Sequence, residues 1–118
     1  MLNTSHLTFA GHLAADPQLR FTPSGKAVAD FRVLVNRSTK NADGEYVDAE
    51  PTSHDCVVWE QVAENLAESA TSGDRVIVHG RIYTETWVDE KTGEKRYRDK
   101  VRVDEIGLSL VRKPAKRI

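Results

Sequence analysis

Hydrophobic and polar residues alternate along much of the chain, and this pattern predicts a protein built mainly of β-strands. Short apolar segments at residues 5–14 and 52–59 are bounded by turn-forming residues, and residues 27–36 show the clearest period of two. Alternate residues of a strand share one face. We therefore expect residues 27–36 to have one apolar face, formed by Ala27, Ala29, Phe31, Val33 and Val35. Gly11 is expected at a bulge or a close backbone approach within the first strand.

The strongest pattern lies between Arg75 and Val103, where two alternating runs flank a polar turn that contains glycine. The first run places Tyr83 and Trp87 on one face and Val76, Val78 and Ile82 on the other. The pattern predicts a β-hairpin with aromatic rings beside a row of cations in the second run, Arg96, Arg98, Lys100 and Arg102.

One helix is predicted, over residues 60–71. Its apolar residues recur at helical spacing, its first residue is acidic, and Gly73 occupies the position expected of a C-terminal cap. We expect this helix to close one end of a barrel. Residues 16–26 and 37–51 are polar and rich in turn-forming residues, which predicts two loops.

The predicted order is three strands, one helix and two strands, which is the order of the five-stranded OB-fold. We expect an all-β domain over residues 1–111, with residues 106–111 as a short extension of the last strand and residues 112–118 as a basic tail. The OB-fold often holds single strands, but a fold alone does not determine a function.

Charge is divided unevenly along the chain. Residues 1–74 hold 5 Lys/Arg and 11 Asp/Glu, whereas residues 75–118 hold 12 and 7, so a net charge of −6 precedes one of +5. Such asymmetry indicates a localised cationic surface. Cations that follow phosphates and rings that stack on unpaired bases are what a single-strand binder needs. An ordinary solvated hairpin is the alternative, and the aromatic residues favour binding.

Other classes of function have little support. No segment resembles a signal peptide or a membrane span, and the lone Cys56 fits a reducing compartment, so we expect a cytoplasmic protein. The chain has no CxxC or HxxxH spacing that would indicate zinc, and we expect no metal and no cofactor. The segments PSGK at 23–26 and SGDR at 72–75 lack phosphate-loop spacing, and we expect no catalysis.

Three blocks carry a resemblance to a known family. They are GHLAADPQLRFTPSGKAVADFRVLVNR at 11–37, VVWEQVAENLAESATSGDRVIVHGRI at 57–82 and TETWVDEKTGEKRYR at 84–98. Over residues 1–111 the chain resembles bacterial single-stranded DNA-binding proteins. The resemblance implies an OB-fold, usually as a homotetramer, that wraps single-stranded DNA without sequence preference and serves DNA replication, recombination and repair.

The resemblance places Trp59 and Trp87 at the family's stacking positions, whereas Thr39 and Ser53 stand where some members carry aromatic rings. Each stacked base contributes about 1–3 kcal/mol, so we expect weaker binding than in a member with four rings. From spacing alone, Trp59 fits a core position equally well. The predicted DNA contacts are Trp59, Trp87, Tyr83, Arg32, Lys26, Arg81, Arg96 and Arg98.

Other residues have structural interpretations. We expect Phe31 and Cys56 in the core and Tyr97 in the core or an interface. The resemblance places His54 at a subunit contact, which its protonation would weaken. Some cations of the last strand should pair with Asp99 or Asp104 or lie at a subunit contact.

The chain stops at RKPAKRI, whereas many family members continue into a linker with an acidic tip that recruits replication and repair proteins. We therefore expect a truncated chain or a tail-less paralogue without that recruitment. Two alternatives to single-stranded DNA remain open, namely an OB-fold RNA-binding or primosome-accessory module and an assembly protein that barely binds nucleic acid.

Overall fold

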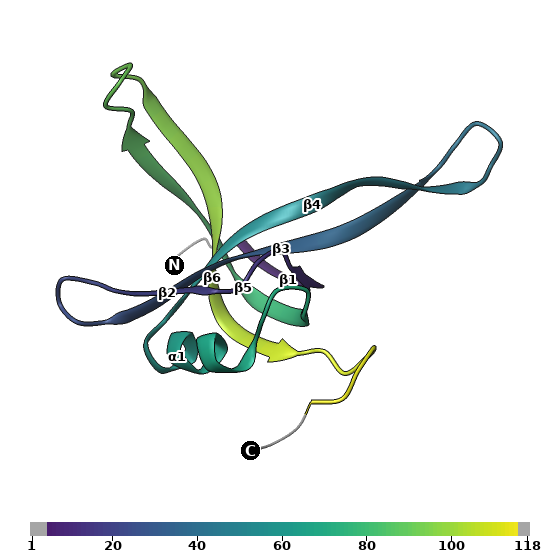
Figure 1. Ribbon diagram of the computed structural model, residues 1–118. Helices are drawn as coiled ribbons and strands as arrows, with labels where there is room; N and C mark the ends of the chain where they lie inside the picture. Colours follow the sequence, from purple (N-terminus) through teal and green to yellow (C-terminus); the bar gives the residue numbers. More distant parts are fainter. Residues whose placement is uncertain (1–4, 116–118) are drawn as a thin grey trace.

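A computed structural model describes residues 5–115 and shows six strands and one helix. Two long two-stranded arms leave a small barrel in different directions (Figure 1). The elements are β1 Ser5–Leu13, β2 Gln18–Phe21, β3 Ala27–Lys40, β4 Tyr46–Trp59, α1 Glu60–Ser69, β5 Arg75–Val88 and β6 Lys95–Leu108.

The strands form one sheet that closes on itself. Its order is β1-β5-β6-β4-β3-β2, and antiparallel pairing of His12 and Leu13 with β3 joins the two ends of a five-stranded barrel. Strands β4 and β6 are parallel where Cys56 lies opposite Val101. The expected OB-fold is confirmed, with α1 between the third and fourth strands of the barrel.

Alternating side chains of the strands fill the barrel, as the sequence pattern predicts. Phe31 and Val33 are buried, and Cys56 is buried opposite Phe31 on the neighbouring strand. Burial raises the pKa of the Cys56 thiol to about 12, which makes it an inert core residue. The core consists of Leu13, Ala27, Ala29, Phe31, Val33, Cys56, Val58, Ala63, Leu66, Ala70, Val76, Val78 and Val101.

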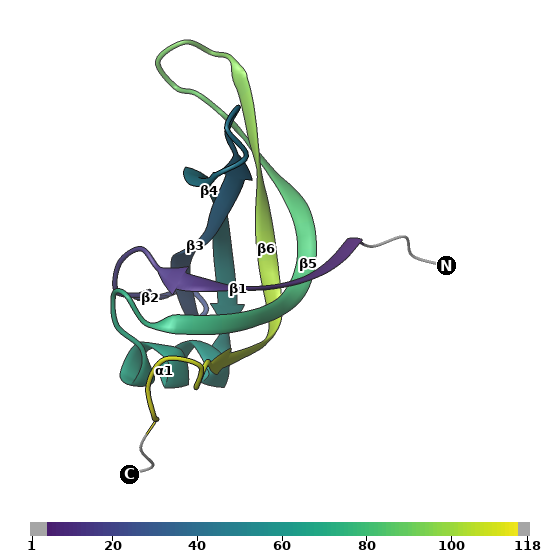
Figure 2. The same cartoon turned by 90° about the vertical axis from the view of Figure 1, so that its right-hand side faces the viewer.

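Helix α1 covers one end of the barrel, below the strands in Figure 2, and places Ala63 and Leu66 in the core. The prediction of a helix that closes the barrel is confirmed. The expected cap is wrong, because the helix ends at Ser69 and Ala70 is extended. Gly73, with φ 88°, instead lies in the following turn, where it donates a hydrogen bond to the Leu13 carbonyl. Among the described residues, no helix is long and apolar enough to cross a membrane.

Two glycines allow strands to cross closely. A Cβ on Gly11 would lie 2.4 Å from the Leu34 carbonyl oxygen, and one on Gly80 would lie 2.4 Å from the Arg102 carbonyl oxygen. Both distances are far below van der Waals contact, so a side chain would push the strands apart. The expectation of a close backbone approach at Gly11 is confirmed.

The prediction of a loop over residues 37–51 is wrong. Strands β3 and β4 continue as a hairpin arm, where Arg37 pairs with Ala49 and Lys40 with Tyr46. The turn uses Gly44 at φ 80°, and the Asn41 side chain accepts hydrogen bonds from two backbone N–H groups. This arm is mostly exposed, so its polar composition gave no burial pattern to read.

The loop predicted over residues 16–26 also contains a strand. Residues Gln18–Phe21 form β2, which pairs with β3 across a turn at Thr22–Lys26. All four side chains of β2 are exposed, including Leu19 and Phe21. Its residues alternate between polar and apolar, but over only four positions flanked by turn-forming residues, so the pattern is too short to distinguish a strand from a loop.

Candidate nucleic-acid interface

One outer face of the β5–β6 hairpin gathers aromatic and charged side chains. Tyr83 lies opposite Lys100, and Trp87 lies opposite Arg96. Directly opposed residues of an antiparallel pair project from the same face. The predicted row of rings beside cations therefore exists, and its members are Arg81, Tyr83, Glu85, Trp87, Arg96, Arg98, Lys100 and Arg102.

Trp87 lies on the arm formed by β5 and β6, and 42% of its surface is exposed. The Arg98 guanidinium lies over its ring, 5.5 Å from the centroid. Such a cation–π contact holds the indole in place without enclosing it in the core. The Trp87 ring remains accessible to a planar partner from solvent.

Trp59 lies on the barrel wall at the end of β4. It is half-buried and absent from the core, and the Arg102 guanidinium lies 5.8 Å from its ring centroid. The ring borders a pocket of about 380 Å³ on the outer surface, together with Arg81 and Tyr83. The core alternative for Trp59 therefore fails, and the indole borders a hollow of a size that suits a flat ring.

The four cations of β6 differ in their surroundings. Only 9% of the Lys100 side chain is exposed, and its ammonium lies 3.4 Å from Glu85 and 3.7 Å from Asp30. The expected pairing of these cations with Asp99 or Asp104 does not occur within residues 5–115. Arg96 instead pairs with Asp89 at 3.3 Å, and Arg98 pairs with Glu85 at 3.5 Å.

Two further predicted phosphate contacts are paired with carboxylates. Arg32 donates to Asp55 at 2.8 Å, and this hydrogen bond raises the pKa of the guanidinium. Arg81 donates two hydrogen bonds to the Asp104 carboxylate in a bidentate contact, which holds the pKa of that carboxyl below its usual range. Lys26 differs, because no carboxylate within residues 5–115 forms an ion pair with its exposed side chain.

A second pocket, of about 580 Å³, lies between the β2–β3 hairpin and the β5–β6 hairpin. Charged residues line it, including Arg20, Arg98 and Lys100. Arg20 donates to Asp30 at 2.6 Å. The sequence pattern did not reveal Arg20, because residues 16–26 predict a loop. The turn signal at Pro23 and Gly25 indicates a hairpin that would have placed Arg20 beside Asp30.

The structure also gives the surroundings of Tyr97, His54 and the two glycine-containing segments considered as phosphate loops. Tyr97 is 72% exposed, so it is not a core residue of the barrel. His54 is half-buried, stacks on Phe9 at a centroid distance of 4.2 Å, and has a pKa lowered by burial. The segments 23–26 and 72–75 form turns that lead into strands, so neither cradles a phosphate at a helix N-terminus.

Metal ligands were not expected from residue spacing. The fold nevertheless brings His6, His79 and Asp104 together from three strands on the outer surface of the sheet. Spacing along the sequence could not reveal this cluster because its members lie far apart in the chain.

An OB-fold barrel that carries accessible indoles among arginines, one on its wall and one on an adjoining arm, belongs to the class of nucleic-acid-binding proteins. A sequence model of the single-strand binding protein family matches residues 4–109. The chain belongs to this family.

Individual relatives agree with this assignment. The chain is 47% identical over 111 residues to a single-stranded DNA-binding protein of Mycolicibacterium smegmatis, which covers 93% of the chain and 67% of the relative. It is 44% identical to one of Paenarthrobacter aurescens, covering 93% of the chain and 64% of the relative. The chain thus spans about two thirds of the length of these curated relatives.

A solved structure resembles the fold. The small single-stranded DNA-binding protein from Streptomyces coelicolor superimposes with a TM-score of 0.75 at 26% sequence identity. The match covers 94% of this chain and 99% of that protein. The structural likeness therefore extends over the barrel and its arms.

Proposed function

We propose that the protein binds single-stranded DNA without sequence preference, by stacking bases on Trp59 and Trp87 and by neutralising phosphates with nearby cations. The observation that carries this proposal is the position of the two indoles. Trp59 lies on the wall of an OB barrel and Trp87 on the adjoining β5–β6 arm, each under a guanidinium, in a chain of the single-strand binding protein family. Every base offers a π-face, so stacking tolerates any sequence.

Phosphate binding exchanges one set of partners for another. Arg32, Arg81 and Arg98 are each held by a carboxylate in the free protein. Exposed ion pairs contribute only about 0–1 kcal/mol, so an incoming phosphate can replace the carboxylate at low cost. Lys26, Tyr83 and Arg96 complete the proposed contact surface. The ion pairs of Arg32, Arg81 and Arg98 also keep these cations ordered before the DNA strand binds.

Self-association extends the interface. Within residues 5–115, the pairing of β1 with β5 runs from Ser5 to His12, whereas its pairing with β3 covers only His12 and Leu13. An unpaired strand edge can add a strand from another chain. We propose that the protein assembles with copies of itself, as a homotetramer by family resemblance, so that one DNA strand contacts several barrels. It would act in the cytoplasm in DNA replication, recombination and repair.

The central experiment follows Trp fluorescence during titration with oligo-dT at two salt concentrations. Stacking should quench the indoles, and log affinity should fall with log salt at a slope of about −0.7 per neutralised phosphate. Mixed-sequence DNA should bind as oligo-dT does. Duplex DNA of equal length should compete poorly because its bases are already stacked. Equal competition by duplex would refute stacking, and tighter binding of oligo-rU than of oligo-dT would indicate an RNA-binding module.

A further inference from the structure

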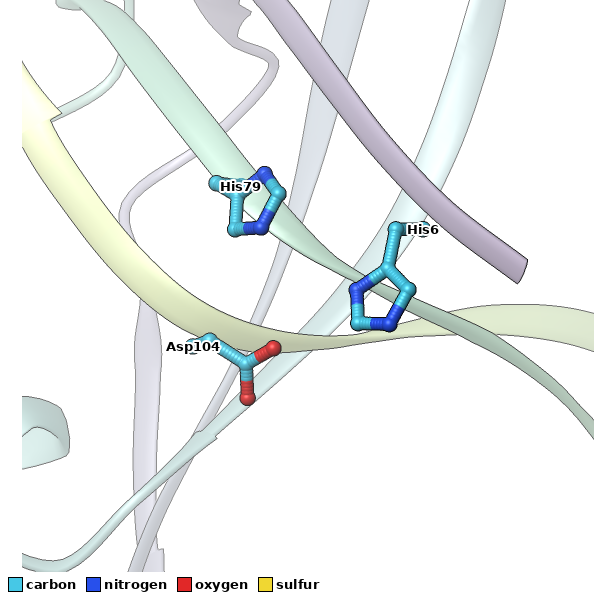
Figure 3. Close-up of side chains that lie close together, drawn as sticks. All are labelled: His6, His79 and Asp104. Atoms are coloured by element: carbon cyan, nitrogen blue, oxygen red, sulfur yellow. The ribbon is translucent and has the colours of Figure 1, made fainter. Parts of the chain in front are cut away.

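Three potential metal ligands meet on the outer surface of strands β1, β5 and β6. They are His6, His79 and Asp104, and their ligand atoms all lie within 4.8 Å of one another. All three side chains are exposed, and the two imidazole rings stack with centroids 5.9 Å apart and 15° between their planes. Figure 3 shows the two rings and the carboxylate directed toward a common space between the strands.

A β-bulge brings the carboxylate to this place. Gly80 pairs with Val103 and His79 with Glu105, so Asp104 is the additional residue on β6. Bulges commonly redirect a side chain. Gly80 allows the bend, because a Cβ there would collide with the Arg102 carbonyl oxygen. The cluster is therefore built into the strand geometry of the barrel.

The Thr8 hydroxyl provides a second, independent observation. Its oxygen lies 2.7 Å from Nδ1 of His79. When Nδ1 carries the proton, it donates to Thr8 and leaves the lone pair on Nε2. A metal-binding histidine characteristically donates its other ring N–H to an oxygen in this way, which fixes the tautomer and the ring orientation. In Figure 3, one ring nitrogen of His79 is on the side facing Asp104 and His6.

We propose that His6, His79 and Asp104 bind a divalent transition-metal ion of the zinc class. Two imidazoles and one carboxylate are a donor set for zinc that leaves a fourth position for water or an anion. Asp104 already accepts two hydrogen bonds from Arg81, but a carboxylate has about four lone-pair sites, so both oxygens keep capacity for a metal. Zinc bonds of about 2.0–2.2 Å bring ligands about 3.4 Å apart, which these exposed side chains reach by small rotations.

The test measures Zn²⁺ binding to the chelator-treated full chain by competition with a chromophoric chelator. One Zn²⁺ per chain is expected. The double variant His6→Gln/His79→Gln should lose the site, and Asp104→Asn should weaken it. Thr8→Val, which keeps the shape of the side chain but removes the hydroxyl, should weaken zinc by about 10–100-fold, a loss typical of removing the partner of a ligating histidine.

The matched control is His12→Gln, which removes a histidine of the same strand outside the cluster and should bind zinc like the parent. Circular dichroism verifies that each variant is folded. A parent chain that fails to bind Zn²⁺, or a double variant that binds it as tightly as the parent, overturns the proposal. Because the parent is titrated without DNA, either result leaves single-strand binding untouched.

Discussion

At the scale of single residues, the two tryptophans illustrate how a ring can be held yet accessible. Trp87 exposes 42% of its surface, and Trp59 is half-buried, with an arginine over each ring. Trp residues in a core would be enclosed on both faces. The rings here keep surface that a base can cover.

Substituting Trp87 by Ala should weaken oligo-dT binding by about 1–3 kcal/mol, because one base loses its stacking partner. Fluorescence anisotropy with a labelled oligonucleotide measures the change. Tyr97→Ala is the matched control, since Tyr97 lies on the same hairpin, on the opposite face from Arg96 and Arg98, and is 72% exposed. Equal losses in the two variants would contradict the assignment of the interface to the face that carries Trp87.

Substituting Asp55 by Asn should strengthen DNA binding. Arg32 then lacks the carboxylate that holds it at 2.8 Å, and a phosphate no longer has to displace that partner. A surface ion pair contributes up to about 1 kcal/mol, so the gain should reach about two- to five-fold. Glu64→Gln on α1 is the control for the change in net charge alone. A loss of affinity in Asp55→Asn would instead mean that Asp55 positions Arg32 for the phosphate.

His54 should make stability depend on pH. Burial lowers the pKa of His54 in the folded protein, whereas an unfolded chain has an imidazole pKa of about 6.5. The stability that comes from neutral His54 is complete above that value and is lost as the pH falls through the lower folded-state pKa. Urea unfolding should therefore show a larger decrease between pH 7.5 and 5.5 for the parent than for His54→Gln, and an equal decrease would contradict this.

At the scale of elements, the strands have two distinct parts. Their barrel halves are held by buried side chains, and their arm halves are held mainly by cross-strand hydrogen bonds. Residues 36–51, which form the β3–β4 arm, contribute no residue to the core cluster, and Val35 at the base of the arm only packs against it. The arms can therefore vary in sequence to suit a partner while the barrel keeps its fold.

Gly80 is predicted to be critical to the barrel. Gly80→Ala would place a Cβ 2.4 Å from the Arg102 carbonyl oxygen and force β5 away from β6. Overpacking of this kind costs about 1–3 kcal/mol in the free energy of unfolding. Gly107→Ala is the matched control on the neighbouring strand, because its Cβ would have no heavy atom within 4 Å. Urea unfolding at neutral pH should separate the two, and similar stabilities would refute the role of close approach at Gly80.

At the scale of the whole molecule, a single barrel offers few contacts to DNA, and the proposed assembly would let one DNA strand contact several barrels. Two arms project from the barrel (Figure 1), and in the described part of the chain β1 pairs with β3 only at His12 and Leu13. Linking binding sites in one assembly makes later contacts intramolecular, so modest individual contacts give high affinity.

Native mass spectrometry should detect an assembly of four chains of 13.2 kDa each. A long oligonucleotide should bind this assembly much more tightly than one that reaches a single barrel, since contacts on neighbouring barrels add to one another. The comparison uses oligo-dT of increasing length at constant salt. A monomer with undiminished affinity for long strands would contradict the proposed wrapping.

The sequence alone determined the barrel strands, the helix and the face on which the candidate interface lies. The period of two identified the barrel strands, the core position of Phe31 and the shared face of Tyr83 and Trp87, because alternation is a local property of a strand. Helical spacing identified α1 for the same reason. The β3–β4 arm is mostly exposed and polar, and the alternation in β2 covers only four residues, so neither pattern predicted a strand.

Only the tertiary structure decided which distant residues meet. Register between strands selected Asp55 for Arg32 and Glu85 for Arg98. The pairing of β1 with β5 and of β5 with β6 brought His6 close to His79 and Asp104. Pairing across strands depends on where the chain bends and closes, and a one-residue shift in register exchanges every partner. Local pattern therefore determines which face a side chain occupies, whereas the three-dimensional register determines its neighbours.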